Sequence, residues 1–75
     1  MTRGTIEYNS NGEKVFLPEL GVDIFIGVLR PNKYTIDKDS YRIDKDIDCK
    51  ESDIVYAELI YSNKTCHILK VEEEY

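Results

Sequence analysis

The chain opens with short runs of strand-forming residues that are separated by turn residues. Such runs lie at residues 2–8, 14–17 and 22–29, and Asn11-Gly12, the strongest hairpin signal in the sequence, lies between the first two. Strands this short, joined by turns this tight, have few ways of burying an apolar face. They predict an antiparallel sheet that closes into a small barrel or a compact sandwich.

The second half of the chain continues the pattern. Residues 54–61 and 65–71 are predicted as two strands, with the turn Ser62-Asn63-Lys64 between them. The sequence also alternates with period two over residues 41–49, which predicts a further strand, although Lys45 interrupts its apolar face. Five or six short strands indicate a mostly-β fold, an OB-like antiparallel barrel without exposed strand edges.

Alternation along each strand predicts which side chains face the core. In the second strand, Val15 and Leu17 are expected to point inward, with Lys14 and Phe16 on the opposite face. The expected core consists of Val15, Leu17, Ile24, Ile26, Val55 and Leu59.

Length and charge narrow the class of protein. The chain of 75 residues is predicted to be a single domain (1–75), in which residues 34–50 form a charged insertion. Its 10 basic and 15 acidic residues give a net charge of −5, whereas nucleic-acid binders usually carry a basic surface. No apolar run is long enough to span a bilayer, so we expect a cytoplasmic protein that does not bind membranes.

No residue pattern marks a reaction or a metal site. Cys49, Cys66 and His67 are the residue types that bind zinc, but they lack a ligand pair spaced as C-x-x-C, and we expect both thiols to be reduced. The lone histidine has no recognisable nucleophile in a catalytic arrangement. The sequence therefore predicts a protein that is not an enzyme, with no catalytic residue, metal or cofactor.

Several short motifs resemble those of cold-shock-like OB-fold domains, including the domains at the N-terminus of RNase II/RNase R-type exoribonucleases. The matching stretches are residues 4–9 (GTIEYN), 12–17 (GEKVFL), Pro18, 23–26 (DIFI) and 52–55 (SDIV). They cover about half of the chain. Glu7 and Glu13 depart from the pattern, which favours lysine there. The catalytic domain of the exoribonucleases is absent, so the resemblance does not imply nuclease activity.

The resemblance implies a module that binds single-stranded RNA or DNA. Such surfaces stack bases on aromatic side chains while basic groups follow the backbone. The expected stacking residues are Tyr8, Phe16 and Phe25, with Lys14, Arg30 and Lys33 as the basic groups. The alternative is that these aromatic residues fill the barrel or a protein interface.

A second hypothesis is an acidic module, or inhibitor, that occupies a basic, nucleic-acid-binding groove of a partner protein. Asp44, Asp46 and Asp48 would share one face of the strand predicted over residues 41–49, roughly 6.8 Å apart, which is twice the rise of a strand. Complementary charge would speed the association of such partners. The alternative reading of the same residues is a solvated face that keeps the protein soluble.

Overall fold

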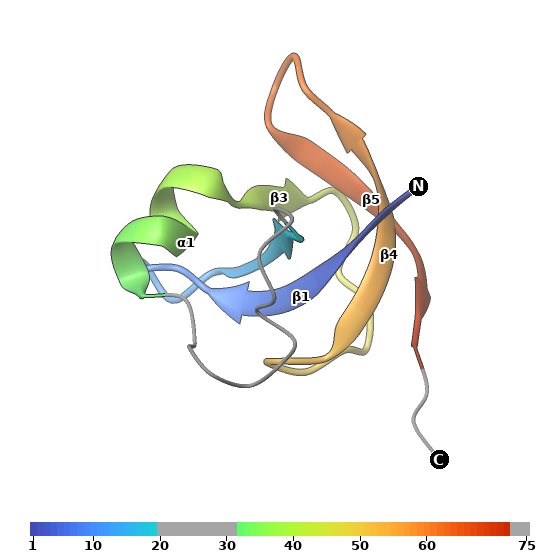
Figure 1. Cartoon of the computed structure of the whole chain (residues 1–75), viewed down its shortest axis with the longest axis horizontal. Coiled ribbons are helices and arrows are strands. Elements are labelled where there is room, and N and C mark those ends of the chain that lie inside the picture. Colours follow the sequence, from blue (N-terminus) through green and yellow to red (C-terminus); the bar gives the residue numbers. More distant parts are fainter. Residues whose placement is uncertain (20–31, 73–75) are drawn as a thin grey trace.

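Five strands form a closed barrel in the computed structural model, which describes residues 1–19 and 32–72 (Figure 1). The elements are β1 (Thr2–Tyr8), β2 (Lys14–Pro18), α1 (Lys33–Asp39), β3 (Tyr41–Ile43), β4 (Ile54–Ile60) and β5 (Thr65–Val71). The strand order around the barrel is β1-β2-β3-β5-β4, and β4 pairs with β1 to close it. The predicted mostly-β, OB-like barrel is thus confirmed. Its strands were predicted to be antiparallel, but the β3–β5 pair is parallel.

The β1–β2 hairpin forms where its turn residues predict. Gly12 has a φ of +79°, a left-handed conformation that glycine adopts without strain, and its amide donates to the carbonyl of Asn9. The Asn9 side chain accepts from the amides of Asn11 and Glu13, at 3.0 and 2.9 Å. β2 ends at Pro18, which has no amide hydrogen to continue a ladder.

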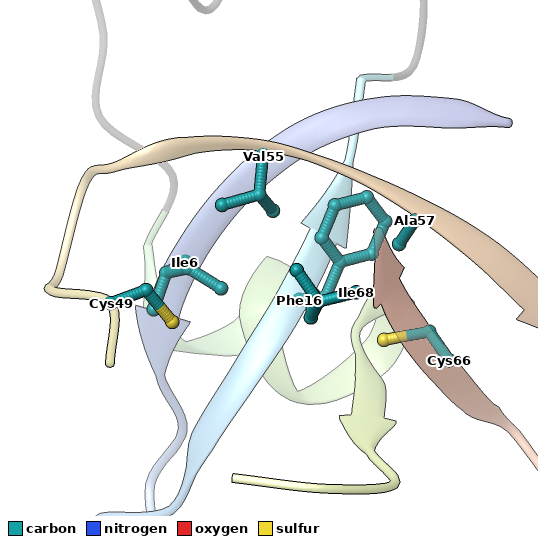
Figure 2. Close-up of a cluster of buried hydrophobic side chains, with 7 residues drawn as sticks. All are labelled: Ile6, Phe16, Cys49, Val55, Ala57, Cys66 and Ile68. Atoms are coloured by element: carbon teal, nitrogen blue, oxygen red, sulfur yellow. The ribbon is translucent and has the colours of Figure 1, made fainter. Parts of the chain in front are cut away.

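The barrel interior is filled from all of its long strands (Figure 2). Its buried side chains are Ile6, Phe16, Cys49, Val55, Ala57, Cys66 and Ile68. Gly4 makes room for the Phe16 ring, because a Cβ at that position would lie 2.7 Å from Phe16 Cζ and 2.3 Å from the carbonyl oxygen of Leu17. The bulkiest interior side chain therefore depends on a glycine in the neighbouring strand.

A second, smaller core lies on the outer face of β2, beneath α1. Val15 and Leu17 pack there with Ile36 of the helix. Val15 and Leu17 were predicted to form the core opposite Phe16, and both are buried opposite Phe16, but in this outer cluster; Phe16 is the one that fills the barrel interior. Alternation gives the two faces of a strand but not which one lies inside, and here both faces are buried.

α1 is held by contacts at its start and along its exposed side. The Asn32 side chain caps the helix by accepting from the amide of Thr35 at 2.8 Å. The Asp37 carboxylate accepts from the amide and hydroxyl of Ser10, and Lys33 Nζ donates to the carbonyl of Tyr8 at 2.6 Å. Ser10 also holds the pKa of Asp37 below its ordinary value by donating to it. The helix is thus attached to the turn between β1 and β2.

The charged segment 34–50 contains most of α1 and all of β3, which is an integral strand of the barrel. The strand predicted over residues 41–49 ends at Ile43, and the chain from Asp44 to Asp53 forms a loop. This loop returns Cys49 to the interior. The strand predicted at Val22–Leu29, with the core residues Ile24 and Ile26, lies outside the described residues.

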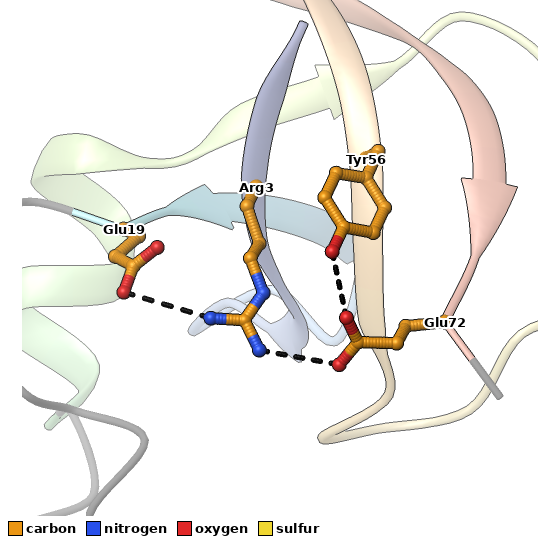
Figure 3. A network of polar contacts seen from close by, with 4 residues as sticks. All are labelled: Arg3, Glu19, Tyr56 and Glu72. Atoms are coloured by element: carbon orange, nitrogen blue, oxygen red, sulfur yellow. Dashed lines mark hydrogen bonds and ion pairs between the residues drawn. The ribbon is translucent and has the colours of Figure 1, made fainter. Parts of the chain in front are cut away.

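Polar side chains near the start of β1 and the end of β5 form a network (Figure 3). Arg3 of β1 lies 3.2 Å from Glu72 and 3.8 Å from Glu19, and the Tyr56 hydroxyl donates to Glu72 at 2.6 Å. The hydrogen bond from Tyr56, followed by that from Arg3, holds the pKa of Glu72 below its ordinary value. The network connects the ends of β2 and β5 to the β1–β4 pair.

Candidate functional site

The outer surface of the barrel is divided into a covered half and an open half. Over β1 and β2, even Thr5 and Glu7 are buried, with 8% and 2% of their surfaces exposed. Over β3, β5 and β4, the outward-facing residues Arg42, His67 and Glu58 are exposed. A ligand therefore has access mainly to the open half.

An open groove of about 570 Å³ crosses this half of the surface. Its lining residues are Glu13, Lys14, Val15, Arg42, Ile43, Asp44, Ile60, Asn63 and Thr65. They come from β2, from β3 and from the β4–β5 hairpin, so the groove lies between the β1–β2 turn and the β4–β5 turn. The strands and turns in these positions bind oligonucleotides and oligosaccharides in OB folds generally.

Strand registers arrange the outward side chains in two neighbouring rows across the sheet. One row, here called the arginine row, contains Val15, Arg42, Thr65 and Ile60, each paired with the next across a strand boundary. Its exposed cation is Arg42, and Ile60 adds an apolar side chain that is 42% exposed.

The second row, here called the acidic row, lies two residues further along β3 and contains Glu13, Asp44, His67 and Glu58. Glu58 pairs with His67, and Glu13 and Asp44 line the same groove. His67 Nδ1 lies 3.1 Å from Asp44 Oδ2, as the parallel β3–β5 register requires. Asp44 and Glu58 thus flank His67 on an exposed surface.

A pair of tyrosines with an adjacent lysine stands beside the groove; we call it the aromatic corner. Tyr41 and Tyr61 meet edge to face, with ring centroids 6.1 Å apart and an interplanar angle of 80°. Lys64 Nζ lies 4.5 Å from the centroid of the Tyr41 ring, and the Lys64 carbonyl accepts from the amide of Arg42. Tyr61 is 73% exposed, so its free ring surface is accessible to a ligand.

Three of the predicted nucleic-acid contacts lie together at the β1–β2 turn, next to the groove. Tyr8 is half-buried and shares a depression at the barrel mouth with Lys14. Lys14 Nζ lies 3.4 Å from Asp46 and 3.3 Å from the carbonyl of Ile47, while Lys33 donates to the carbonyl of Tyr8. Both lysines therefore already have partners within the protein.

The predicted stacking role of Phe16 is wrong for this fold. Its side chain is fully buried inside the barrel, where no base can reach the ring. Phe25 and Arg30, the other two predicted contacts, lie outside the described residues.

The three aspartates predicted to share a strand face do not do so. All three follow the end of β3 and belong to the loop that leads to β4. Asp44 pairs with His67, Asp46 pairs with Lys14, and Asp48 is exposed. A regular row of carboxylates exists, but it runs across the strands and includes only Asp44 of the three.

Tyr41, Tyr61, Arg42 and Lys64 were not predicted as site residues. They come together because β3 pairs in parallel with β5, which brings the start of β3 beside the β4–β5 turn. The only available signal was that each of two distant segments, Tyr41-Arg42 and Tyr61 to Lys64, contains a tyrosine and a cation. Parallel pairing of this kind leaves no local signature in the sequence.

The described residues show no reactive centre. Burial raises the pKa of the Cys49 thiol and raises that of Cys66 to about 12, so both thiols are protonated and poor nucleophiles. Residues 1–19 and 32–72 contain no cluster of three or more histidine, cysteine or acidic side chains that fits a metal ion. In the same residues, no helix has the length and apolar character needed to cross a lipid bilayer.

Comparisons with family models, with curated proteins and with solved structures gave no match to this chain. The groove, its two rows and the aromatic corner are therefore the basis for inferring a function.

Proposed function

We propose that the protein is a non-catalytic OB-like module that binds single-stranded nucleic acid in the groove between the β1–β2 and β4–β5 turns. The observation that carries this proposal is the aromatic corner. There, the exposed Tyr61 meets Tyr41 edge to face, and Lys64 Nζ lies 4.5 Å from the centroid of the Tyr41 ring. The neighbouring residue Arg42 lines a groove in the position that OB folds use for oligonucleotides.

Each part of this surface has a role in holding a strand. Tyr61 offers a free ring on which a base can stack, and such contacts contribute about 1–3 kcal/mol per base. The cations offered to the flanking phosphates are Arg42, which lines the groove, and Lys64, whose Nζ lies over Tyr41 and also donates to the carbonyl of Lys38 at 3.4 Å. Tyr8 and Lys33 extend the same surface past the β1–β2 turn.

The acidic charge of the chain limits the electrostatic share of binding. Phosphates are attracted to Arg42 and Lys64 but are repelled by the acidic row two residues away. Each neutralised phosphate contributes about −0.7 to the slope of log affinity against log salt for single strands. With so few cations, we expect a shallow salt dependence and a large contribution from stacking.

The test measures anisotropy of a labelled, unstructured oligonucleotide at low salt. Tyr61→Ala should weaken binding by about 1–3 kcal/mol, and Lys64→Ala should weaken it and reduce the salt slope. Tyr34→Ala is the matched control, because Tyr34 is also 73% exposed but lies on α1. Equal effects of the two tyrosine variants, or no binding at about 20 mM salt where the Debye length is roughly 20 Å, would overturn the proposal.

A second candidate function is the binding of a basic protein partner, and the acidic row is the observation that favours it. Glu13, Asp44 and Glu58 present three carboxylates along one exposed line. A lysine- and arginine-rich peptide that binds the protein, and is released by Asp44→Asn together with Glu13→Gln, would support this function. We prefer the nucleic-acid proposal because carboxylates alone do not explain the exposed aromatic corner.

A further inference from the structure

We infer that the groove selects nucleobases with adjacent N–H donors, and therefore prefers guanine to thymine or uracil. This inference rests on the proposed function and names the ligand more closely. It follows from the two carboxylates, Glu13 and Asp44, that line the same groove as the proposed phosphate-binding cation Arg42.

The two rows orient a bound strand. Arg42 lies on β3, Asp44 directly follows the end of that strand, and both line the groove. The negative backbone is attracted to the arginine row and to Lys64, and it is repelled by the acidic row. A strand that keeps its phosphates near Arg42 consequently directs its base edges over Glu13 and Asp44.

Ionised carboxylates accept hydrogen bonds but cannot donate them. The Watson–Crick edge of guanine presents two neighbouring donors, N1–H and the 2-amino group, which match the two oxygens of one carboxylate. Cytosine and adenine present one amino group beside an acceptor nitrogen. Thymine and uracil present a single N–H between two carbonyl oxygens, which the carboxylate repels. Single-stranded bases expose this edge to a protein, whereas paired bases do not.

Both carboxylates keep acceptor capacity for a base. Glu13 is exposed and receives one hydrogen bond in the described structure, from Asn9 Nδ2 at 3.2 Å to Oε1. Asp44 is exposed for 38% of its side chain and is positioned by His67 Nδ1. A carboxylate has about four lone-pair sites, so one such contact leaves the group able to accept from a ligand. Charge-assisted pairs of this kind are stronger than neutral ones.

The experiment compares four versions of one oligothymidine of about nine nucleotides, within the range that one OB fold covers. The central position carries guanine, cytosine, adenine or thymine, and a single guanine avoids quadruplex formation. For the wild-type protein we expect the guanine version to bind about tenfold more tightly than the thymine version, as a bidentate base contact provides. Cytosine and adenine should fall between them.

The double variant Glu13→Gln with Asp44→Asn should remove the guanine preference without weakening the thymine version, since it also removes repulsion of the backbone. The matched control is Asp48→Asn with Glu51→Gln, which removes two exposed carboxylates outside the groove. The control should keep the tenfold preference. Thermal unfolding of all three proteins should be similar, because the altered side chains lie at the surface.

The outcomes separate this inference from the proposed function. Equal binding of the four oligonucleotides, or a guanine preference that survives the double variant, would overturn the base selectivity and leave nucleic-acid binding intact. No binding of any oligonucleotide would overturn both. Capture of a basic peptide by the wild type and not by the double variant, with no oligonucleotide bound, would also overturn both and would assign the acidic row to a protein partner.

Discussion

The two halves of the barrel's outer surface differ in what covers them. On β2, the outward-facing Val15 and Leu17 are 1% and 2% exposed, and Ile36 of α1 packs against them. On β3 and β5, the equivalent outward positions Arg42 and His67 are exposed. One short helix thus makes part of an OB-like surface into a second core. The face left for a ligand is centred on β3 and β5 instead of β2.

The covered half is also built differently from the barrel interior. The interior cluster draws side chains from four strands and the loop after β3, whereas the cluster under α1 consists of three residues among those described. The helix is otherwise held by hydrogen bonds to the β1–β2 turn and by one from Lys64 Nζ to the carbonyl of Lys38. We therefore expect the interior to determine global stability and the covered half to open separately.

The largest effect is expected for Phe16→Ala, which empties the centre of the interior. Deleting a buried phenylalanine ring costs about 3–5 kcal/mol. That is comparable to the whole stability that a core of this size provides, about 3–5 kcal/mol. The variant should be largely unfolded at room temperature by circular dichroism. A cooperative unfolding transition near the wild-type midpoint would contradict the assignment of Phe16 to the interior.

Ile36→Ala should have a smaller and more local effect. The loss of this side chain costs about 2–3 kcal/mol, at the lower end for such substitutions, because only a small cluster surrounds it. Hydrogen exchange should accelerate at the amides of Ile36, Ser40 and Ser10, whose bonds hold the helix and its attachment. The β4–β5 amides should keep their protection. Uniform acceleration across the barrel would show that the two cores form one cooperative unit.

Glu72→Gln should change the acid dependence of stability by a modest amount, because the side chain is only partly buried and solvent screens its ion pair. Since the folded-state pKa of Glu72 is below its ordinary value of 4.5, its stabilising contribution is present above that pH. It is lost as the pH falls from 4.5 through the lower folded-state pKa. The difference in unfolding midpoint between wild type and variant should thus shrink over this window. A difference that stays constant with pH would rule out the ionised contact with Tyr56 and Arg3.

The smallest effect on stability is expected for Tyr61→Ala, on the open half. Since Tyr61 is 73% exposed, the unfolding free energy should change by no more than about 0.5 kcal/mol. The same variant is expected to weaken oligonucleotide binding by about 1–3 kcal/mol. A loss of more than about 1 kcal/mol of stability would show that the ring supports the barrel through Tyr41, and the aromatic corner would then be structural.

Sequence reasoning succeeded where the signal was local. The bounds of β1, β2, β4 and β5 agree with the prediction to within one residue, because period-two patterns and turn residues define them. α1 was not predicted, because a seven-residue helix containing Thr35 and Ile36 has little intrinsic stability and depends on packing against β2.

The candidate site was less accessible to prediction because it depends on contacts between distant residues. Lys14 and Phe16 were predicted to share one face of β2 and to contact nucleic acid. They do share a face, but it is the inner one, with Lys14 reaching the barrel mouth and Phe16 filling the interior. Tyr41 and Tyr61 become neighbours only through the β3–β5 pairing. The expected aspartate row failed because the strand that would carry it ends at Ile43.

The shortness of β3 has a consequence for how the barrel folds and opens. β3 contributes two residue pairs to β2 and two to β5, whereas the β1–β2 and β4–β5 hairpins have longer ladders and short connections. Local hairpins form rapidly, while closure between distant segments is slow, so the β3 seam is expected to close last and to open first. A strand of nucleic acid in the groove would bridge β2, β3 and β5 and bind only the closed seam. Its binding free energy would then stabilise the least stable strand pairings of the barrel, those of β3. The barrel would therefore open less often when the groove is occupied.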